Sequence, residues 1–186
     1  MGYESALASI KEIYGRTVYS HKTHEKTVEQ LNGRIVWLKW INLVLMVLTF
    51  GGVLNAVFAG GAALNLLTVL ASALALALAI YRMSFNPEKE ILAHRKTANE
   101  LRHIRDQYAD LIGDIRDGVL TDDQIRQQRD SLRDRLDQVY ADRPDTTSKA
   151  YKRAQKALGT EEDMTFSKRE VDRFLPPEHR DPPAER

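Results

Sequence analysis

The longest apolar stretch of this chain runs from Trp40 to Tyr81, which is 42 residues without one charged side chain. A helix needs about 20 mostly apolar residues to cross a bilayer, so the stretch is long enough for two passes. Gly60-Gly61 lies at its centre, where a tight turn is expected. The pattern therefore predicts a transmembrane hairpin over 40–81, with its two spans at 40–58 and 62–81.

The two ends of this stretch carry the residue types that anchor a span at a membrane surface. Basic side chains bracket the stretch and can extend their charges to the lipid headgroups, and aromatic rings lie beside them, where amphipathic rings prefer the interface. The five predicted interface anchors are Trp37, Lys39, Trp40, Tyr81 and Arg82.

Lysine and arginine gather on both sides of the hairpin, whereas the turn has none. The basic residues closest to the two ends are Lys22, Lys26, Arg34 and Lys39 before the first span, and Arg82, Lys89, Arg95 and Lys96 after the second. Because basic segments stay on the cytoplasmic side, we expect a multi-pass protein with both arms and both termini in the cytoplasm.

The arm at 1–39 has a heptad pattern, in which residues suited to helix packing recur at spacings of three and four. Its positions are Leu7, Ile10, Tyr14, Thr17, His21, His24, Val28, Leu31, Ile35 and Leu38. This spacing places them on one face of a helix that packs against another helix. We expect one helix from about residue 5 into the first span, with Gly33 as a candidate position for a kink.

The second cytoplasmic arm, 82–141, begins with a helix-start signal. Asn86 can cap a helix that Pro87 opens, and Gly118 can end it. The helix between them has its own seam: Ile91, His94, Ala98, Leu101, Arg105, Tyr108, Ile112 and Ile115. Thr121 and Gln124 then form a capping-box pattern that predicts another helix to about residue 141.

The remaining segment, 142–186, is a polar tail in which a short helix is expected at 149–158. Its last eleven residues, 176–186, hold four prolines and no apolar periodicity, so we expect a disordered end. The whole pattern predicts an all-α membrane protein, in which a two-helix transmembrane hairpin is joined to long cytoplasmic helices that pack as a coiled-coil-like bundle.

Composition narrows the possible functions. The chain has no cysteine, which excludes disulfides and cysteine-based zinc sites. Lysine plus arginine number 27 against 26 aspartates and glutamates, so no basic excess favours nucleic-acid binding. No Walker loop, dinucleotide fingerprint or nucleophile elbow occurs in the sequence. We therefore expect no enzyme and no catalytic, cofactor-binding or metal-binding residue.

Polar and small residues interrupt the two spans at a few positions, which are the candidate functional residues: Asn42, Gly51, Gly52, Asn55, Ala56, Asn65 and Ser72. Asn55 and Asn65 lie at similar depth and are expected to hydrogen-bond across the hairpin. The polar groups either join helices or line an oligomeric pore, and the small residues either close the hairpin or join subunits. No ionisable residue lies in the spans, which argues against a proton relay.

Three histidines are expected to approach one another on the two cytoplasmic helices: His21, His24 and His94. The favoured interpretation is a set of packing positions that hydrogen-bond between helices, because the heptad register already explains them. A metal site and a pH switch are the two alternatives.

The sequence resembles the SLATT superfamily, the SMODS- and SLOG-associating two-transmembrane effector domains of bacteria. The resemblance rests on Tyr14–Lys26 (YGRTVYSHKTHEK), the hairpin, and His94–Ile115 (HRKTANELRHIRDQYADLIGDI). It implies a bacterial inner-membrane effector of conflict or antiviral defence systems, which assembles into a homo-oligomer and perforates the bilayer. The trigger would be a nucleotide signal or a partner protein, such as a nucleotidyltransferase or a SLOG-type sensor.

Two functions are therefore expected as alternatives. The first is a pore-forming or membrane-disrupting defence effector, whose partners are the lipid bilayer, further copies of the chain and a sensor protein, with no nucleic acid. The second is a membrane-anchored coiled-coil scaffold that recruits cytoplasmic partners and leaves the membrane intact.

Overall fold

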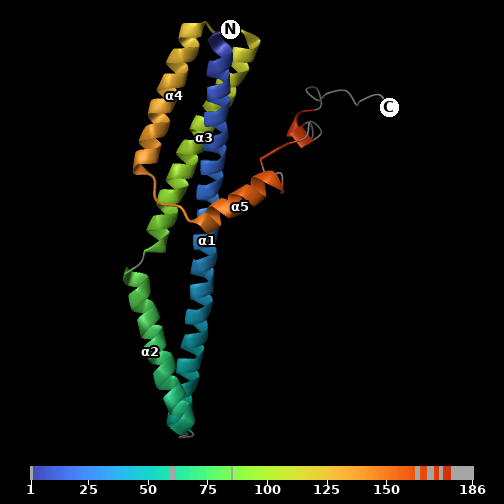
Figure 1. Ribbon diagram of the computed structural model, residues 1–186. Coiled ribbons are helices and arrows are strands. Elements are labelled where there is room, and N and C mark those ends of the chain that lie inside the picture. Colours follow the sequence, from blue (N-terminus) through green and yellow to red (C-terminus); the bar gives the residue numbers. More distant parts are fainter. Residues whose placement is uncertain are drawn as a thin grey trace, which may run out of the picture.

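The computed structural model describes residues 2–58, 62–84, 86–161, 164–166, 170–171 and 174–176. Within these ranges it contains five helices and no strand. The helices are α1 (Gly2–Phe58), α2 (Ala62–Ser84), α3 (Pro87–Asp117), α4 (Asp122–Asp142) and α5 (Ser148–Gly159). The expected all-helical architecture is confirmed (Figure 1). The predicted turn at Gly60-Gly61 and the end of the predicted tail, 177–186, lie outside the described residues.

Helix α1 is one uninterrupted helix of 57 residues, which at 1.5 Å per residue is about 85 Å long. It passes through Gly33 without a break, because a single glycine in a helix costs only about 1 kcal/mol. Figure 1 shows α1 running the length of the molecule, beside α3 and α4 in its first half and beside α2 in its second. The same helix is therefore both a bundle helix and the first predicted span.

The predicted helix boundaries in the second arm are confirmed by their caps. Asn86 Oδ1 accepts a hydrogen bond of 3.1 Å from Lys89 N, and Pro87 opens α3. Gly118 ends α3 in the left-handed conformation, at φ 68°, which glycine adopts without steric cost. Thr121 and Gln124 form the expected capping box at the start of α4.

The hydrophobic core lies where α1, α3 and α4 meet. It consists of Ile10, Leu101, Ile104, Tyr108, Leu111, Ile115, Ile125, Leu132 and Leu136. Ile104 and Leu111 are almost fully buried, although the narrow heptad seam predicted for α3 omitted both. Helix α3 packs against α1 on one side and α4 on another, so its buried face is wider than a two-helix seam.

Helix α5 crosses α1 near the middle of the molecule (Figure 1). Its buried face consists of Ala150, Ala154 and Ala157, which are completely inaccessible to solvent. Alanines at this spacing lie on one side of a helix and let the two backbones approach closely. The ring of Tyr151 lies 6.3 Å from that of Tyr19, between centroids, and adds an aromatic contact to the crossing.

We predict that Ala154→Leu detaches α5 from α1. The larger side chain has no space at a fully buried position, and overpacking costs about 1–3 kcal/mol. Trypsin cleavage within α5 of the membrane-inserted full chain should then become faster. Gln155→Leu, at an exposed position of the same helix, is the matched control. Equal cleavage rates in the two variants would contradict the proposed docking of α5 through its alanine face.

Candidate functional site: the hairpin and the polar seam

The inner face of the hairpin is closed by small residues. Gly52 is buried, and a Cβ atom placed on it would overlap the side chain of Thr68 in α2. The hydroxyl of Thr68 donates a 2.8 Å hydrogen bond to the carbonyl of Leu64 in its own helix, so it adds no polar contact across the hairpin. Gly52 therefore serves the packing of α1 on α2, whereas Gly51 and Ala56 are exposed.

Several polar groups of the spans bond within their own helix. Ser72 Oγ donates to Thr68 O at 2.8 Å, a return to the preceding turn that is common for short hydroxyl side chains. Asn42 Nδ2 lies 3.6 Å from Met46 Sδ. These groups need no second helix to satisfy them.

Two polar atoms of α1 are different, because Thr49 Oγ1 and Asn55 Nδ2 are buried in the hairpin without a hydrogen-bond partner. Asn65 is exposed, and within the described residues no hydrogen bond joins it to Asn55. The expected Asn55–Asn65 bond is therefore wrong. Similar depth along two antiparallel helices does not place two side chains on facing sides, and here the contact side of α2 belongs to Thr68 and Ala71.

The predicted interface anchors lie at the two ends of the apolar stretch. Trp37 and Trp40 are 65% and 64% exposed, as expected for rings that face headgroups instead of protein. Lys39 is exposed, and the side chain of Arg82 lies outside the described residues. Tyr81 accepts a further contact, since its hydroxyl meets the guanidinium of Arg34, whose Cζ lies 5.7 Å from the ring centroid. The sequence pattern did not indicate this pairing.

Between the hydrophobic core and the hairpin, α1 packs against α3 and α5, and polar side chains of α1 and α3 are buried there. We call these side chains the polar seam. Its members are Thr17, His21, Lys22, Thr23, His24, Thr27, His94 and Thr97. Three of its threonines donate to carbonyls one turn earlier: Thr17 to Ile13, Thr23 to Tyr19 and Thr27 to Thr23, at 2.7–2.9 Å. The Nζ atom of Lys22 lies 2.9 Å from Glu25 Oε2.

A direct contact between two histidines joins the helices in this seam. His24 Nδ1 and His94 Nδ1 are 2.8 Å apart, and the ring centroids are separated by 5.0 Å. One nitrogen must donate and the other accept, so at least one ring has to be neutral. Burial is the main cause that lowers the pKa of His24 to about 4, and the charges of His94, Arg143 and His21 add to it.

The other two histidine pKa values shift in the same direction. Burial lowers the pKa of His94, with Glu90 acting against it. Burial also lowers the pKa of His21, where Glu25 opposes the shift and Arg105 supports it. His21 Nδ1 and His94 Nε2 are nevertheless buried without a hydrogen-bond partner. Within the described residues, no group of three or more histidine, aspartate and glutamate side chains is placed to hold a metal ion.

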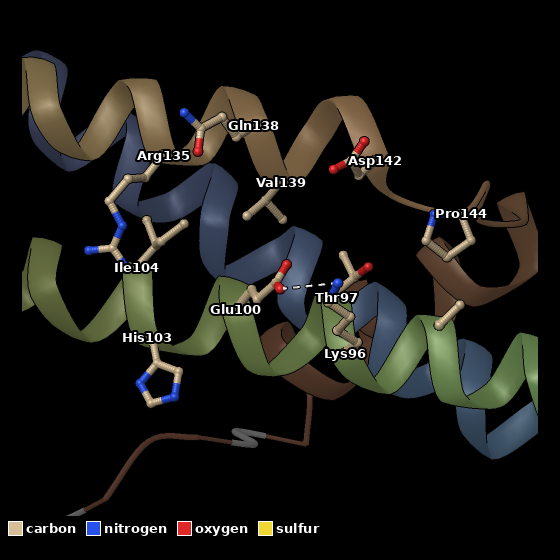
Figure 2. Close-up of a pocket in the computed structure, with 11 residues that line it drawn as sticks. Lys96, Thr97, Glu100, His103, Ile104, Arg135, Gln138, Val139, Asp142 and Pro144 are labelled. Atoms are coloured by element: carbon tan, nitrogen blue, oxygen red, sulfur yellow. Dashed lines mark ion pairs between the residues drawn. The ribbon is translucent and has the colours of Figure 1, made fainter.

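A groove of about 500 Å³ runs between α3 and α4 beside this seam (Figure 2). Lys96 and Glu100 form an ion pair of 3.9 Å on its α3 side, and Arg135 and Asp142 line the α4 side. His103 belongs to the same surface, and in Figure 2 its ring points away from α4. Charges of both signs alternate along the groove, as on the solvated faces of packed helices.

The fold and these contacts define an all-helical protein with two helices long and apolar enough to cross a membrane. Residues 7–170 match the family described as SMODS and SLOG-associating 2TM effector domain family 4. Because the match covers most of the chain, the protein belongs to this family, which confirms the resemblance noted above. No curated protein and no solved structure matches the chain.

We predict that Gly52→Leu separates the two helices of the hairpin, because the added side chain would displace Thr68. Gly51→Leu is the matched control, since a Cβ atom on Gly51 meets nothing within 4 Å. A disulfide formed between cysteines introduced at Leu45 and Ala75, each two helical turns along its own helix from the Gly52–Thr68 contact, reports closure. Its yield should fall in the Gly52→Leu background and persist with Gly51→Leu, and equal yields would contradict the proposed packing.

We predict that acid destabilises the folded protein through His24. The pKa of His24 is lower in the folded protein than its ordinary 6.5, so the unfolded state binds the proton first. Stability is therefore complete above about pH 6.5 and decreases as the pH falls toward 4, by about 3 kcal/mol from this group. Thermal unfolding of the full chain in nanodiscs, followed by circular dichroism, should reveal this loss.

The matched variants separate the histidine pair from other titrating groups. The double variant His24→Gln/His94→Gln should depend less on pH than the parent between pH 6.5 and 4.5, whereas His103→Gln, at an exposed position, should behave like the parent. The same pH dependence in parent and double variant would exclude the pair as its cause.

Proposed function

We propose that this protein is a membrane effector of a bacterial conflict or antiviral defence system, which assembles in the inner membrane and permeabilises it when triggered. The family description supports the effector role. The observation that carries the membrane step is the presence of two buried polar atoms without a hydrogen-bond partner, Thr49 Oγ1 and Asn55 Nδ2, inside a hairpin whose spans have no charged residue.

The argument for assembly is energetic. A polar group without a partner costs several kcal/mol in hydrocarbon, where no water can replace the missing bond. If the hairpin opens during assembly, Thr49 and Asn55 gain hydrogen-bond partners on a neighbouring hairpin, or water in a pore. Asn65, exposed on α2, adds a third polar side chain at the lipid-facing surface of a single hairpin. A homo-oligomer with a neutral polar lining satisfies all three.

The proposed trigger acts on the bundle formed by α1, α3 and α4. Because α1 continues without interruption into the first span, any rotation of its N-terminal half is carried into the hairpin. The family description names SMODS and SLOG as associated with this effector domain. The partner that we propose is a nucleotidyltransferase or a SLOG-type sensor. We propose that such a partner binds the bundle and shifts α1 relative to α3.

The alternative is a membrane-anchored scaffold. In this alternative, the exposed helices and grooves of the same bundle recruit a partner. The close packing at Gly52 keeps each hairpin closed, so the membrane stays intact. The scaffold and the effector differ in one measurable respect, which is whether the membrane potential survives activation.

We predict that the parent, expressed with its genomic neighbours and triggered, collapses the membrane potential, measured with a voltage-sensitive dye. Asn55→Leu should abolish the effect while the protein still inserts, because it removes the proposed polar lining at no cost to the apolar hairpin. Leu54→Ile, at an exposed position one residue earlier, is the control. A triggered parent that leaves the potential intact supports the scaffold, and an active Asn55→Leu contradicts the lining role.

Topology is tested separately, since the chain has no cysteine of its own. Single cysteines at Ser9, Gly61 and Ser131 can be probed with an impermeant thiol reagent in spheroplasts. Gly61→Cys should label in intact spheroplasts and the other two only after lysis, because the positive-inside rule retains both arms in the cytoplasm. Labelling of Ser9→Cys before lysis would reverse the proposed orientation.

A further inference from the structure

A small cavity lies where α1, α2 and the start of α3 meet. Its volume is about 110 Å³. The three helices and the connection between α2 and α3 all contribute to its lining, which consists of Leu31, Arg34, Leu38, Tyr81, Asn86, Pro87 and Glu90. Tyr81 is one of the predicted interface anchors, and none of the proposed pore-lining residues belongs to this cavity.

The position of the cavity along α1 corresponds to the headgroup layer of a bilayer. Arg34 precedes Trp40, the first residue of the uncharged stretch, by six residues, which is about 9 Å of helix. Tyr81 ends the same stretch on α2. Headgroups add roughly 5–8 Å to each side of the hydrocarbon core, so the backbone of Arg34 lies at the outer edge of this layer and its long side chain can reach the headgroups.

Two opposite charges face this cavity from different helices. Arg34 comes from α1 and Glu90 from α3, and within the described part of the chain neither belongs to an ion pair. The guanidinium of Arg34 is already directed to the hydroxyl and ring of Tyr81. The cavity thus has a cationic and hydrogen-bonding side, formed by Arg34 and Tyr81, and an anionic side, formed by Glu90.

We propose that this cavity binds a phospholipid headgroup in which a phosphodiester is joined to a primary ammonium, as in phosphatidylethanolamine. The phosphodiester oxygens accept hydrogen bonds from Arg34 and Tyr81, and the ammonium donates to the carboxylate of Glu90. A trimethylammonium headgroup has no N–H donor for Glu90, and its three methyl groups need more space than a small cavity offers. A glycerol headgroup lacks the positive charge.

The bound lipid would join the bundle to the hairpin, because its two charged ends contact α1 and α3. This proposal needs only that the two apolar helices cross a membrane, and it does not depend on the effector role. The dye experiment on membrane potential and the binding experiment below can therefore fail independently.

The test is native mass spectrometry of the purified full chain in detergent, titrated with phospholipids that share the same acyl chains and differ in headgroup. The parent should retain phosphatidylethanolamine roughly fivefold better than phosphatidylcholine, the preference expected from one partly exposed charge-assisted hydrogen bond. Glu90→Gln should abolish that preference, and Arg34→Gln should weaken retention of both lipids. Glu88→Gln, at an exposed position on the same helical turn, is the control.

Three outcomes would overturn the proposal. These are equal retention of the two lipids by the parent, an unchanged preference in Glu90→Gln, and displacement of phosphatidylethanolamine by equimolar free phosphoethanolamine, which would indicate a soluble ligand. If Glu90→Gln loses helicity by circular dichroism, Glu90→Asp serves as the second variant. It keeps the carboxylate and should keep the preference, and its loss would also contradict the assigned role.

Discussion

The packing of α3 along the N-terminal half of α1 positions the other elements of the protein. Helix α1 alone would be an 85 Å rod with an exposed packing face, and α3 covers that face from Ile10 to the start of the hairpin. Helix α4 is held in turn by α3, through the leucines and isoleucines of the core. Because α3 is also the direct continuation of α2, the same contact determines how the hairpin meets the bundle.

This interface changes character along its length. At the end far from the hairpin it is apolar and contributes the usual stabilisation of a buried core, about 25 cal/mol for each Å² removed from water. In the polar seam it depends on a hydrogen bond between His24 and His94, two neutral rings whose burial disfavours protonation. Each unpartnered buried nitrogen nearby, His21 Nδ1 and His94 Nε2, costs about 1–3 kcal/mol. The polar seam is therefore the part of the α1–α3 interface where separating the two helices costs the least free energy.

The hairpin also combines close packing with unsatisfied polar groups, on a smaller scale. Close packing at Gly52 holds α1 to α2, while Thr49 and Asn55 retain unsatisfied polar atoms in the same contact. Our proposal, in which the hairpin stays closed in the resting membrane and assembles after a signal, requires such a balance between packing and unsatisfied groups. In our proposal, the continuous α1 connects the two weak points, so that a partner acting on the seam reaches the hairpin through one rigid helix.

The sequence by itself determined the helices and where they begin and end, because those features depend on neighbours a few residues away. The uncharged stretch from Trp40 to Tyr81 located the two apolar helices, and the side chains of Asn86 and Thr121 and the backbone of Gly118 located the ends of α3 and the start of α4. Only the tertiary structure decided which faces meet. It separated Gly52 from Gly51, removed the expected Asn55–Asn65 bond and brought Arg34 to Tyr81 across 47 positions of the chain. Periodicity states that a helix has a packing face, but the rotation of that face toward a partner depends on contacts between segments far apart in the sequence, and no local signal encodes it.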